Sequence, residues 1–464
     1  MPVKSTGLNE LVLFLPDIRE LLKENNYAQV KECLRQMHPS DIAGSWQYLS
    51  ETEKLIIFRF LEQARMVQVF EYLSFNDQKF LLDHLKSEEI STVLEGMSSD
   101  DEADLFEDLP KKVVRKLFSL MRQEKARQLQ HLLSYPPDSC GGIMSTDFVA
   151  LTKGMTAREA LLKVQQATRH RPDERVHVAY VTDEEGRLLG GVSITDLVSA
   201  LPDDKIDGIM SLARLIKLNV NWDREEAAKI FAKYDLVAAP ITDDNGKLVG
   251  VVTIDDVVDV IQEEATKDIY GLGKISSPES AADVSYIKTS VFALIRKRVL
   301  WLAILMFIAA FITGPLLKGY AGILQSIIIL AVFIPMIMDS GGNAGQQSLA
   351  MMVRGLATGD ITPYLWSKVL RKELVSGIGL GLIMAVLAGI SAAILGGMDI
   401  QLSITVGVSL FVVICISTVV GAMLPIFFKR LGLDPAIAAS PFITTLVDAT
   451  CVIVYFSMAK WLLL

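Results

Sequence analysis

The sequence predicts a multidomain membrane protein: an all-α solenoid N-terminal domain, an α/β tandem repeat, a connecting helix and an all-α transmembrane domain of five helices. Three observations predict this fold class. Residues 1 to 135 repeat every 12 residues, residues 136 to 262 contain two copies of one pattern, and residues 299 to 464 hold five long apolar segments. A chain of 464 residues that is 51% hydrophobic is too long for one domain and too apolar to be wholly soluble.

The first zone, residues 1 to 135, has the pattern of short stacked helices. Ser50, Ser74 and Ser98 each precede acidic residues and an apolar stretch, as helix N-caps do. Helices of about two turns that bury one another's apolar faces form an α-solenoid, which is a scaffold and not a catalyst. The repeating apolar positions are Met37, Leu49, Leu61, Leu73, Leu85, Met97, Leu109 and Met121.

The second zone, residues 136 to 262, is a tandem repeat. DEEGRLLGGVSITDLV from Asp183 recurs as DDNGKLVGVVTIDDVV from Asp243, at an offset of 60 residues. Each copy predicts a helix, a strand, a turn at Gly186 or Gly246, a second strand and a final helix. The spacing, the glycines and the final aspartate all recur, and the zone resembles a pair of CBS domains, at about 136 to 202 and 203 to 262.

The CBS resemblance implies a regulatory module, because such pairs often bind adenine nucleotides. ATP is therefore a possible regulator, with a candidate nucleotide position near Asp196. Thr195 stands before it, where a nucleotide-binding relative would place a basic residue, so ATP binding is a hypothesis.

The third zone begins with a predicted connecting helix over residues 263 to 298 and continues as the transmembrane domain. About 20 apolar residues suffice to cross a bilayer. The five apolar spans cover residues 299 to 317, 322 to 338, 374 to 395, 402 to 428 and 436 to 463. Basic residues precede the first span and fill the loops after the second and fourth spans. In the loops at 318 to 321 and 396 to 401, Lys318 is the single basic residue. The positive-inside rule then places the N-terminal domains in the cytoplasm and the C-terminus outside the cell membrane.

Charge and motifs narrow the class of function. Residues 1 to 290 hold 34 basic and 48 acidic side chains, and residues 291 to 464 hold 11 and 6. The acidic surplus argues against nucleic acid as a partner and leaves metal cations or simple solubility. The four cysteines lack CxxC or Cys/His spacing, and no HExxH, GxSxG or P-loop is present, so a zinc site or an enzyme is not indicated.

Asp448 lies inside the fifth apolar span, with almost nothing nearby to neutralise it. A carboxylate at membrane depth costs about 2.5 to 3.5 kcal/mol on insertion scales, so it normally faces a wet path, a cation or a partner. Five spans are few to enclose a pore, so we expect a homodimer in which both copies place Asp448 on the shared path. Two carboxylates suit a hydrated Mg²⁺. The alternative is an Asp448 bonded within its own helix to Thr444, Thr445 or Thr450.

The domain order, together with GGNAGQQS and LDPAIAASPFITTLVDAT, resembles the MgtE family of magnesium channels over nearly the whole chain. The resemblance implies a dimeric Mg²⁺-selective channel in which Asp448 holds hydrated Mg²⁺. Ser440 stands where an Asn is usual, and Cys451 where Gly is often found. Prolines in the fifth span free backbone carbonyls, and glycines in the second allow close backbone approach or form a tight loop. The candidate pore ligands are Asp448, Thr444 and Ser440, and the candidate pore-lining residues are Gly341, Gly342, Asn343, Pro435 and Pro441.

By the same resemblance, acidic residues of the soluble part match a magnesium sensor. Spacings of three and four place carboxylates on one helical face, and opposed acidic faces repel unless divalent ions lie between them. Lys267 departs from the family's more acidic linker and removes one ligand or acts as an internal cation. An ordinary solvated acidic face is the alternative. The candidate regulatory ligands are Asp100, Asp104, Asp223, Glu225, Asp256, Asp259, Glu264 and Asp268.

These residues suggest a two-state switch as a working hypothesis. Abundant cytoplasmic Mg²⁺ draws the acidic domains together, and the connecting helices close the pore. Several weak sites can share the roughly 5.5 kcal/mol that moves a population from 1:99 to 99:1. The alternative function is a CBS-regulated transporter of Mn²⁺, Co²⁺ or Ni²⁺, because carboxylate and water ligands discriminate modestly among these ions.

Overall fold

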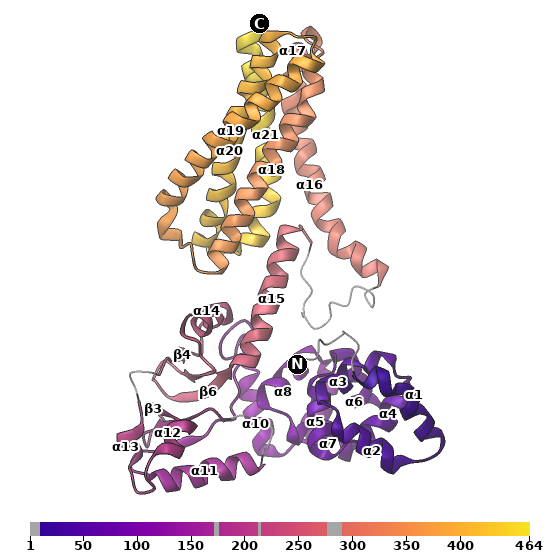
Figure 1. The fold of residues 1–464 in the computed structure, drawn as a ribbon, viewed down its shortest axis with the longest axis vertical. Helices are drawn as coiled ribbons and strands as arrows, with labels where there is room; N and C mark the ends of the chain where they lie inside the picture. Colours follow the sequence, from indigo (N-terminus) through magenta and orange to yellow (C-terminus); the bar gives the residue numbers. More distant parts are fainter. Residues whose placement is uncertain (1–9, 171–175, 212–214, 276–289) are drawn as a thin grey trace, which may run out of the picture. The chain divides into compact units, whose positions relative to one another are not determined.

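The computed structural model describes residues 10–170, 176–211, 215–275 and 290–464 (Figure 1). The chain forms two compact units, Met1–Ile261 and Gln262–Leu464. Each unit has its own hydrophobic core.

The first unit starts with a helical solenoid in which a new helix begins every 12 residues from α4 to α10, as the sequence predicts. Ser50 caps α4 in a capping box with Glu53, which satisfies two backbone N–H groups at the helix start. Trp46, Phe58 and Phe70 are buried along successive helices, with ring centroids 6.3 and 6.2 Å apart, and they fill the inside of the solenoid. The elements are α1 (Glu10–Lys23), α2 (Tyr27–Gln36), α3 (Pro39–Gly44), η1 (Trp46–Tyr48), α4 (Glu51–Phe60), α5 (Gln63–Glu71), α6 (Phe75–His84), α7 (Ser87–Gly96), α8 (Ser99–Asp108), α9 (Lys111–Leu120) and α10 (Gln123–Leu132).

Two α/β modules of the same topology complete the first unit. Each has a three-stranded sheet in which the first pair of strands is parallel and the second antiparallel. The turns at Gly186 and Gly246 have φ of +79° and +80°, which explains the glycine at both. The first module comprises β1 (Ala150–Thr152), α11 (Ala157–His170), β2 (Val178–Thr182), β3 (Leu188–Ser193) and α12 (Ile194–Ser199). After α13 (Ile206–Ile209), the second comprises β4 (Leu218–Asn219), α14 (Arg224–Tyr234), β5 (Ala238–Thr242), β6 (Leu248–Thr253) and α15 (Ile254–Leu272).

The connecting helix differs from the prediction of one helix over residues 263 to 298. It is the continuation of the last helix of the second module, because α15 runs without a break from Ile254 to Leu272. Residues 276–289 lie outside the described residues, and the next helix begins at Val291.

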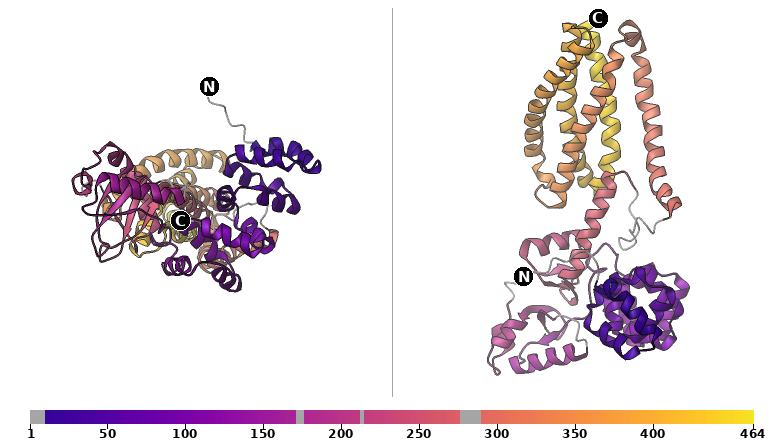
Figure 2. Two further views of the ribbon diagram at one scale, coloured as in Figure 1. Left: turned by 90° about the horizontal axis from the view of Figure 1, so that it is seen from below. Right: turned by 45° about the vertical axis from the view of Figure 1, so that its right-hand side comes forward.

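The second unit is a bundle of long helices, and Figure 2 shows α18 to α21 side by side. Within the described residues, four segments are long and apolar enough to cross a membrane: Val291–Gly319, Pro363–Leu395, Ile400–Arg430 and Pro435–Leu463. The helices are α16 (Val291–Gly319), α17 (Ala321–Ser326), α18 (Leu330–Ala357), α19 (Trp366–Leu395), α20 (Ile400–Arg430) and α21 (Pro435–Leu463).

The predicted second span, residues 322 to 338, is wrong in its bounds. The helix breaks after Ser326, and α18 runs from Leu330 through the whole of GGNAGQQS to Ala357. The alternative of a tight glycine loop is therefore also wrong. A Cβ on Gly341 would lie 2.6 Å from Cγ1 of Val413, so this glycine is needed for close packing of α18 on α20. Polar residues within α18 make this helix less apolar than the four segments named above.

Candidate metal sites

Asp448 lies on α21, a helix that Asp434 caps by accepting a hydrogen bond of 2.7 Å from the backbone N–H of Ala436. The Asp448 side chain is partly exposed within a single subunit. The hydroxyls of Thr444 and Thr450 donate to the backbone carbonyls of Pro441 and Leu446 in their own helix. In the described contacts the hydroxyls of Thr444, Thr445 and Thr450 make no hydrogen bond to Asp448, so the alternative interpretation finds no support there.

The end of α15 packs against the first half of α21. The hydroxyl of Ser440 donates to the carbonyl oxygen of Leu272 over 3.0 Å. A Cβ on Gly271 would lie only 3.0 to 3.2 Å from backbone atoms of Ala436 and Ile437, so the glycine permits this close approach. Two predicted ion ligands, Ser440 and Thr444, therefore contact the segment at the end of α15.

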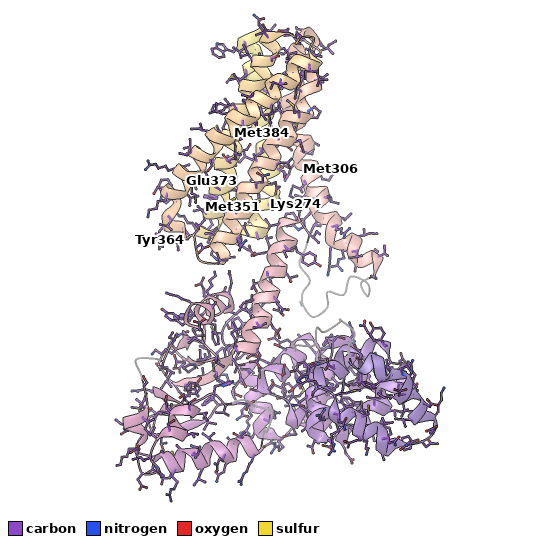
Figure 3. All side chains as sticks on the ribbon, viewed as in Figure 1. Lys274, Met306, Met351, Tyr364, Glu373 and Met384 are labelled. Atoms are coloured by element: carbon purple, nitrogen blue, oxygen red, sulfur yellow. The ribbon has the colours of Figure 1, made fainter. Side chains whose placement is uncertain are left out.

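Lys274, just after the end of α15, also contacts α21 (Figure 3). Its Nζ donates to Oγ1 of Thr444 over 3.2 Å. Burial lowers the pKa of Lys274, and the charge of Asp448 opposes that effect. An ammonium group thus lies within the electrostatic reach of the intramembrane carboxylate. Sequence reasoning missed Lys274, because nothing in its local pattern distinguishes it from other lysines.

One face of α18 is polar and exposed in the single subunit. Asp339, Asn343 and Gln347 lie four residues apart on this face, and Nδ2 of Asn343 donates to Oδ2 of Asp339 over 3.1 Å. Nothing lies within 4 Å of a Cβ placed on Gly342, which therefore also borders open space. A polar face of this kind is costly against lipid and normally lines water or another protein surface.

The remaining pore-lining candidates lie elsewhere. Gly341 and Pro441 are buried inside one subunit, and Pro435 is the first residue of α21. Sequence reasoning missed Asp339, because it follows the predicted second span by one residue, whereas the structure places it inside the long helix α18.

Glu373 on α19 was also missed. It is buried, and its Oε2 accepts a hydrogen bond of 2.8 Å from the hydroxyl of Ser348 on α18. This bond links two helices of the membrane unit.

An acidic interface lies inside the first unit, where α8 meets the start of α15. The carboxyl groups of Asp100 and Asp256 are both buried there and act on each other's pKa. Oδ1 of Asp100 is buried and, among the described residues, has no hydrogen-bond partner. Burial, followed by the charge of Asp100, raises the pKa of Asp256 to about 9. Burial and Asp100 likewise raise the pKa of Asp101 to about 7, with smaller contributions from Asp255 and Asp259.

These shifts have a common physical cause. Several carboxyl groups that are close together and poorly hydrated cannot all ionise without a cation between them. Ser98 and Thr253 hold the arrangement by donating hydroxyl hydrogen bonds of 2.7 Å to Asp101 and Asp256 respectively. The structure thus brings together two of the predicted regulatory ligands, Asp100 on α8 and Asp256 on α15.

Comparisons with known proteins agree with this architecture. The family described as MgtE, divalent cation transporter, matches residues 334–458, the MgtE intracellular N domain matches 37–138, and the CBS domain matches 140–203 and 207–263. The magnesium transporter MgtE of Thermus thermophilus is 35% identical over 450 residues, which is 96% of this chain and 98% of that relative. The chain belongs to the MgtE family of divalent cation transporters.

Two further comparisons agree with this result. The magnesium transporter MgtE of Enterococcus faecalis is 33% identical over 73% of this chain and 72% of its own length. The crystal structure of the soluble part of a magnesium transporter is 29% identical, covers 53% of this chain and 96% of that one, and superposes with a TM-score of 0.50. The predicted recognition and fold class are thereby confirmed.

The other predicted regulatory ligands of this MgtE chain have mostly local partners. Asp223 caps α14 by accepting from the N–H of Glu225 over 2.7 Å, and Glu225 pairs with Lys229 at 2.9 Å. In the described contacts neither reaches the α8 face. Glu264 pairs with Lys267 at 2.9 Å, which is the internal cation that the sequence suggests. Asp104 and Asp268 lie on α8 and α15, one turn after Asp100 and Glu264.

The acidic interface fits a hydrated Mg²⁺ better than a fully liganded metal. Among the described residues, no three His, Cys, Asp or Glu side chains come together closely enough to hold a metal ion. Mg²⁺ dehydrates reluctantly and is commonly bound through one or two carboxylates and several waters. Asp100 and Asp256 supply that pair of carboxylates, and the unpartnered Oδ1 of Asp100 is available as an oxygen ligand.

Proposed function

We propose that this chain forms a Mg²⁺-selective channel that mediates magnesium uptake and holds the passing ion at Asp448. The observation that carries the proposal is a carboxylate on a membrane helix to which the neighbouring hydroxyls of Thr444 and Thr450 do not bond. Its cost in a bilayer is recovered if it faces a cation in water. The MgtE relatives named magnesium transporters support Mg²⁺ as the ion.

The pore is completed by a second copy of the chain. The exposed polar face with Asp339 and Asn343 on α18 supports this, because such a face needs water or protein beside it. In a two-fold dimer each side chain occurs twice, so two Asp448 carboxylates face one path. Two acids and the retained waters match the coordination that Mg²⁺ prefers. The N-terminal domains are cytoplasmic and the C-terminus is outside, as the charge of the loops favours.

Cytoplasmic Mg²⁺ closes the channel by binding between acidic surfaces. The raised pKa of Asp256 supports this, since its charge is costly there until a cation arrives. Asp256 lies on α15, and the same helix ends at Leu272, whose carbonyl accepts the hydrogen bond from Ser440. A single helix therefore carries both the sensor carboxylate and the contact with α21. Movement of this helix when Mg²⁺ binds at Asp256 is transmitted to α21.

Uptake into proteoliposomes tests the function. Wild type and Asp448→Ala are compared for Mg²⁺, Mn²⁺, Co²⁺ and Ca²⁺, with Asp360→Ala, an exposed acid in a loop of the same unit, as the matched control. We expect Mg²⁺ uptake by wild type and the control, and its loss in Asp448→Ala. Undiminished uptake by Asp448→Ala would refute the proposed site. Faster uptake of Mn²⁺ or Co²⁺ than of Mg²⁺ would favour the alternative ion.

ATP binding to the CBS pair is a separate proposal. Asp196 is exposed in the first turn of α12, where its backbone N–H bonds to the hydroxyl of Ser193 and leaves the carboxylate open. Calorimetric titration of the purified protein with ATP tests it. The absence of binding at millimolar ATP would remove the nucleotide from the regulation.

A further inference from the structure

We infer that Lys274 is an intramolecular cation that occupies the Asp448 site and competes with the transported ion. This inference rests on the proposed function and adds a residue to it. The evidence comes from the backbone of Lys274, from its side-chain contact and from the charges that surround it.

The backbone places Lys274 at a position that lysine rarely occupies. Its φ is +56°, in the left-handed region. The N–H of Lys274 bonds to the carbonyl of Gly271 at 3.0 Å, and that of Ile275 to the carbonyl of Tyr270 at 2.9 Å. These two bonds define a Schellman motif, in which Gly or Asn is the usual residue at the left-handed position. Here the glycine, Gly273, comes one residue earlier.

The side chain gives a reason for a lysine at this strained position. The docking of Gly271 on Ala436 and the bond from Ser440 to Leu272 fix the end of α15 against α21. From there the ammonium reaches Oγ1 of Thr444 at 3.2 Å. Asp448 is four residues after Thr444 on the same helix, and residues so spaced share one face.

The surrounding charges make Asp448 the partner of this ammonium. Asp448 is the charged group that acts on Lys274 among the described residues, and Lys274 is the cation that acts on Asp448. The ammonium of Lys274 balances the charge of one Asp448 carboxylate, but it is part of the chain and cannot cross the membrane. A hydrated divalent ion must displace it to bind, so Lys274 sets the Mg²⁺ concentration at which the site fills.

Uptake kinetics of Lys274→Met in proteoliposomes test this competition. Loss of the attraction between the ammonium and the carboxylate, worth up to about 1 kcal/mol, lowers the half-saturating Mg²⁺ concentration about five-fold and leaves the maximal rate unchanged. Lys274→Arg keeps the wild-type value. Lys429→Met, which removes a partly exposed lysine at the end of α20, is the matched control.

A second variant separates competition from a structural role. Lys274→Gly relieves the left-handed strain and removes the ammonium, so it too must lower the half-saturating concentration. Unchanged half-saturation in both variants would overturn the inference, and so would a fall in maximal rate alone. The proposed function fails separately, through undiminished uptake by Asp448→Ala.

A different observation, at the start of α19, carries a second inference. Lys368, Arg371, Lys372, Val375 and Ser376 line an open hollow of about 370 Å³. Their spacing of three and four residues places them on one face of the helix. Glu373, the acid within this segment, is buried on another face and bonded to Ser348, so it does not neutralise them. The three cations are exposed, and none forms an ion pair with a described residue.

We propose that this hollow binds the phosphate headgroup of an anionic phospholipid. Exposed apolar residues, including Ile378 and Leu382, continue along α19 beyond the hollow and suit an acyl chain. Basic pockets beside membrane helices on the cytoplasmic side commonly bind such headgroups. The continuity of cations and apolar surface favours a lipid over free phosphate as the occupant.

Native mass spectrometry of the full chain, mixed with phosphatidylglycerol or phosphatidylcholine, tests the lipid site. We expect the wild type to retain phosphatidylglycerol preferentially, even with excess inorganic phosphate, and K368Q/R371Q/K372Q to lose the preference. K111Q/K112Q/R115Q removes the same charges from exposed positions on α9 and is the control. Equal retention by the α19 variant and wild type, or displacement by phosphate, would reject the lipid site.

Discussion

The hydroxyl of Ser440 on α21 donates a hydrogen bond of 3.0 Å to the carbonyl oxygen of Leu272 in the last turn of α15. Carbonyls in the last turn of a helix lack partners within the helix, so Ser440 satisfies a group that would otherwise be left unpaired. Ser440 is fully buried. Its hydroxyl proton is therefore used to join α15 to α21, about two helical turns before the carboxylate that we propose binds the ion.

Ser440→Ala should weaken closure by cytoplasmic Mg²⁺. It removes one hydrogen bond, worth about 1 kcal/mol, from the contact between α15 and α21. We expect the Mg²⁺ concentration for half-inhibition in patch recordings to rise about five-fold. Ser391→Ala on α19, whose hydroxyl bonds only within its own helix, should leave inhibition unchanged. Unaltered inhibition in Ser440→Ala would show that the bond does not contribute to closure.

Gly271→Val should have a larger effect in the same direction. Its first added carbon would lie 3.0 Å from the backbone of Ala436, where nothing flexible can yield, so the end of α15 must move away. We expect current to persist at Mg²⁺ concentrations that close the wild type. Gly208→Val, at an exposed position where a Cβ meets nothing within 4 Å, is the control. Wild-type closure by Gly271→Val would contradict the proposed role of this contact.

Asp100→Asn should allow the acidic interface to form without Mg²⁺. The substitution removes one of two facing carboxylates and leaves an amide that can donate to Asp256. We expect limited proteolysis of the full chain to show Mg²⁺-independent protection between α8 and α15. Asp203→Asn, in an exposed loop of the first CBS module, should keep the Mg²⁺ dependence of wild type. Cleavage of Asp100→Asn that still depends on Mg²⁺ would exclude repulsion at this pair as the cause.

The interface should also respond to pH in the absence of Mg²⁺. Asp101 and Asp256 have pKa values raised to about 7 and about 9, so the closed interface retains protons that the open state releases. Closure is then most favourable at low pH and is lost progressively as pH rises from about 4, the ordinary carboxyl range, towards 9. Protection from proteolysis at pH 6 without Mg²⁺, and a requirement for Mg²⁺ at pH 9, is the expected result. Protection that increases with pH would contradict it.

Most of the architecture could be predicted because it rests on periodicity. The 12-residue repeat gave the starts of α4 to α10, and the 60-residue repeat gave both modules with their glycine turns. Asp448 could be selected because a carboxylate in an apolar span is conspicuous against its surroundings. The predicted helix boundaries were wrong where polar residues and glycines lie inside a helix, as in α18.

Contacts between distant segments could not be predicted. Ser440 and Leu272 are 168 residues apart, and Lys274 and Thr444 are 170 apart. Neither pair has a local signal, since both depend on how the end of α15 packs against α21. Glu373 was likewise hidden, because it follows Arg371 and Lys372, and only the fold shows that it points inward to Ser348.

The final prediction concerns the stability of α8, which carries Asp100. Lys125 on α10 forms a buried salt bridge of 3.0 Å with Glu102 on α8, and it also donates to the carbonyl of Met97. Burial raises the pKa of Glu102 to about 7, and the charge of Lys125 opposes the shift. Lys125→Met leaves Glu102 buried without its cation and should destabilise the solenoid by about 3 to 5 kcal/mol.

Scanning calorimetry of the full chain measures this loss as a fall in the temperature of its first unfolding transition. The double variant Glu102→Leu/Lys125→Met should recover most of the stability, because apolar residues of similar size commonly replace a buried ion pair at little cost. Lys79→Met, on the solenoid helix α6 and outside the described salt bridges, is the control. If Lys125→Met unfolds at the wild-type temperature, the ion pair does not hold α8 in place. The position of Asp100 must then be fixed by the hydrogen bonds of Ser99 with Asp147 and Thr146.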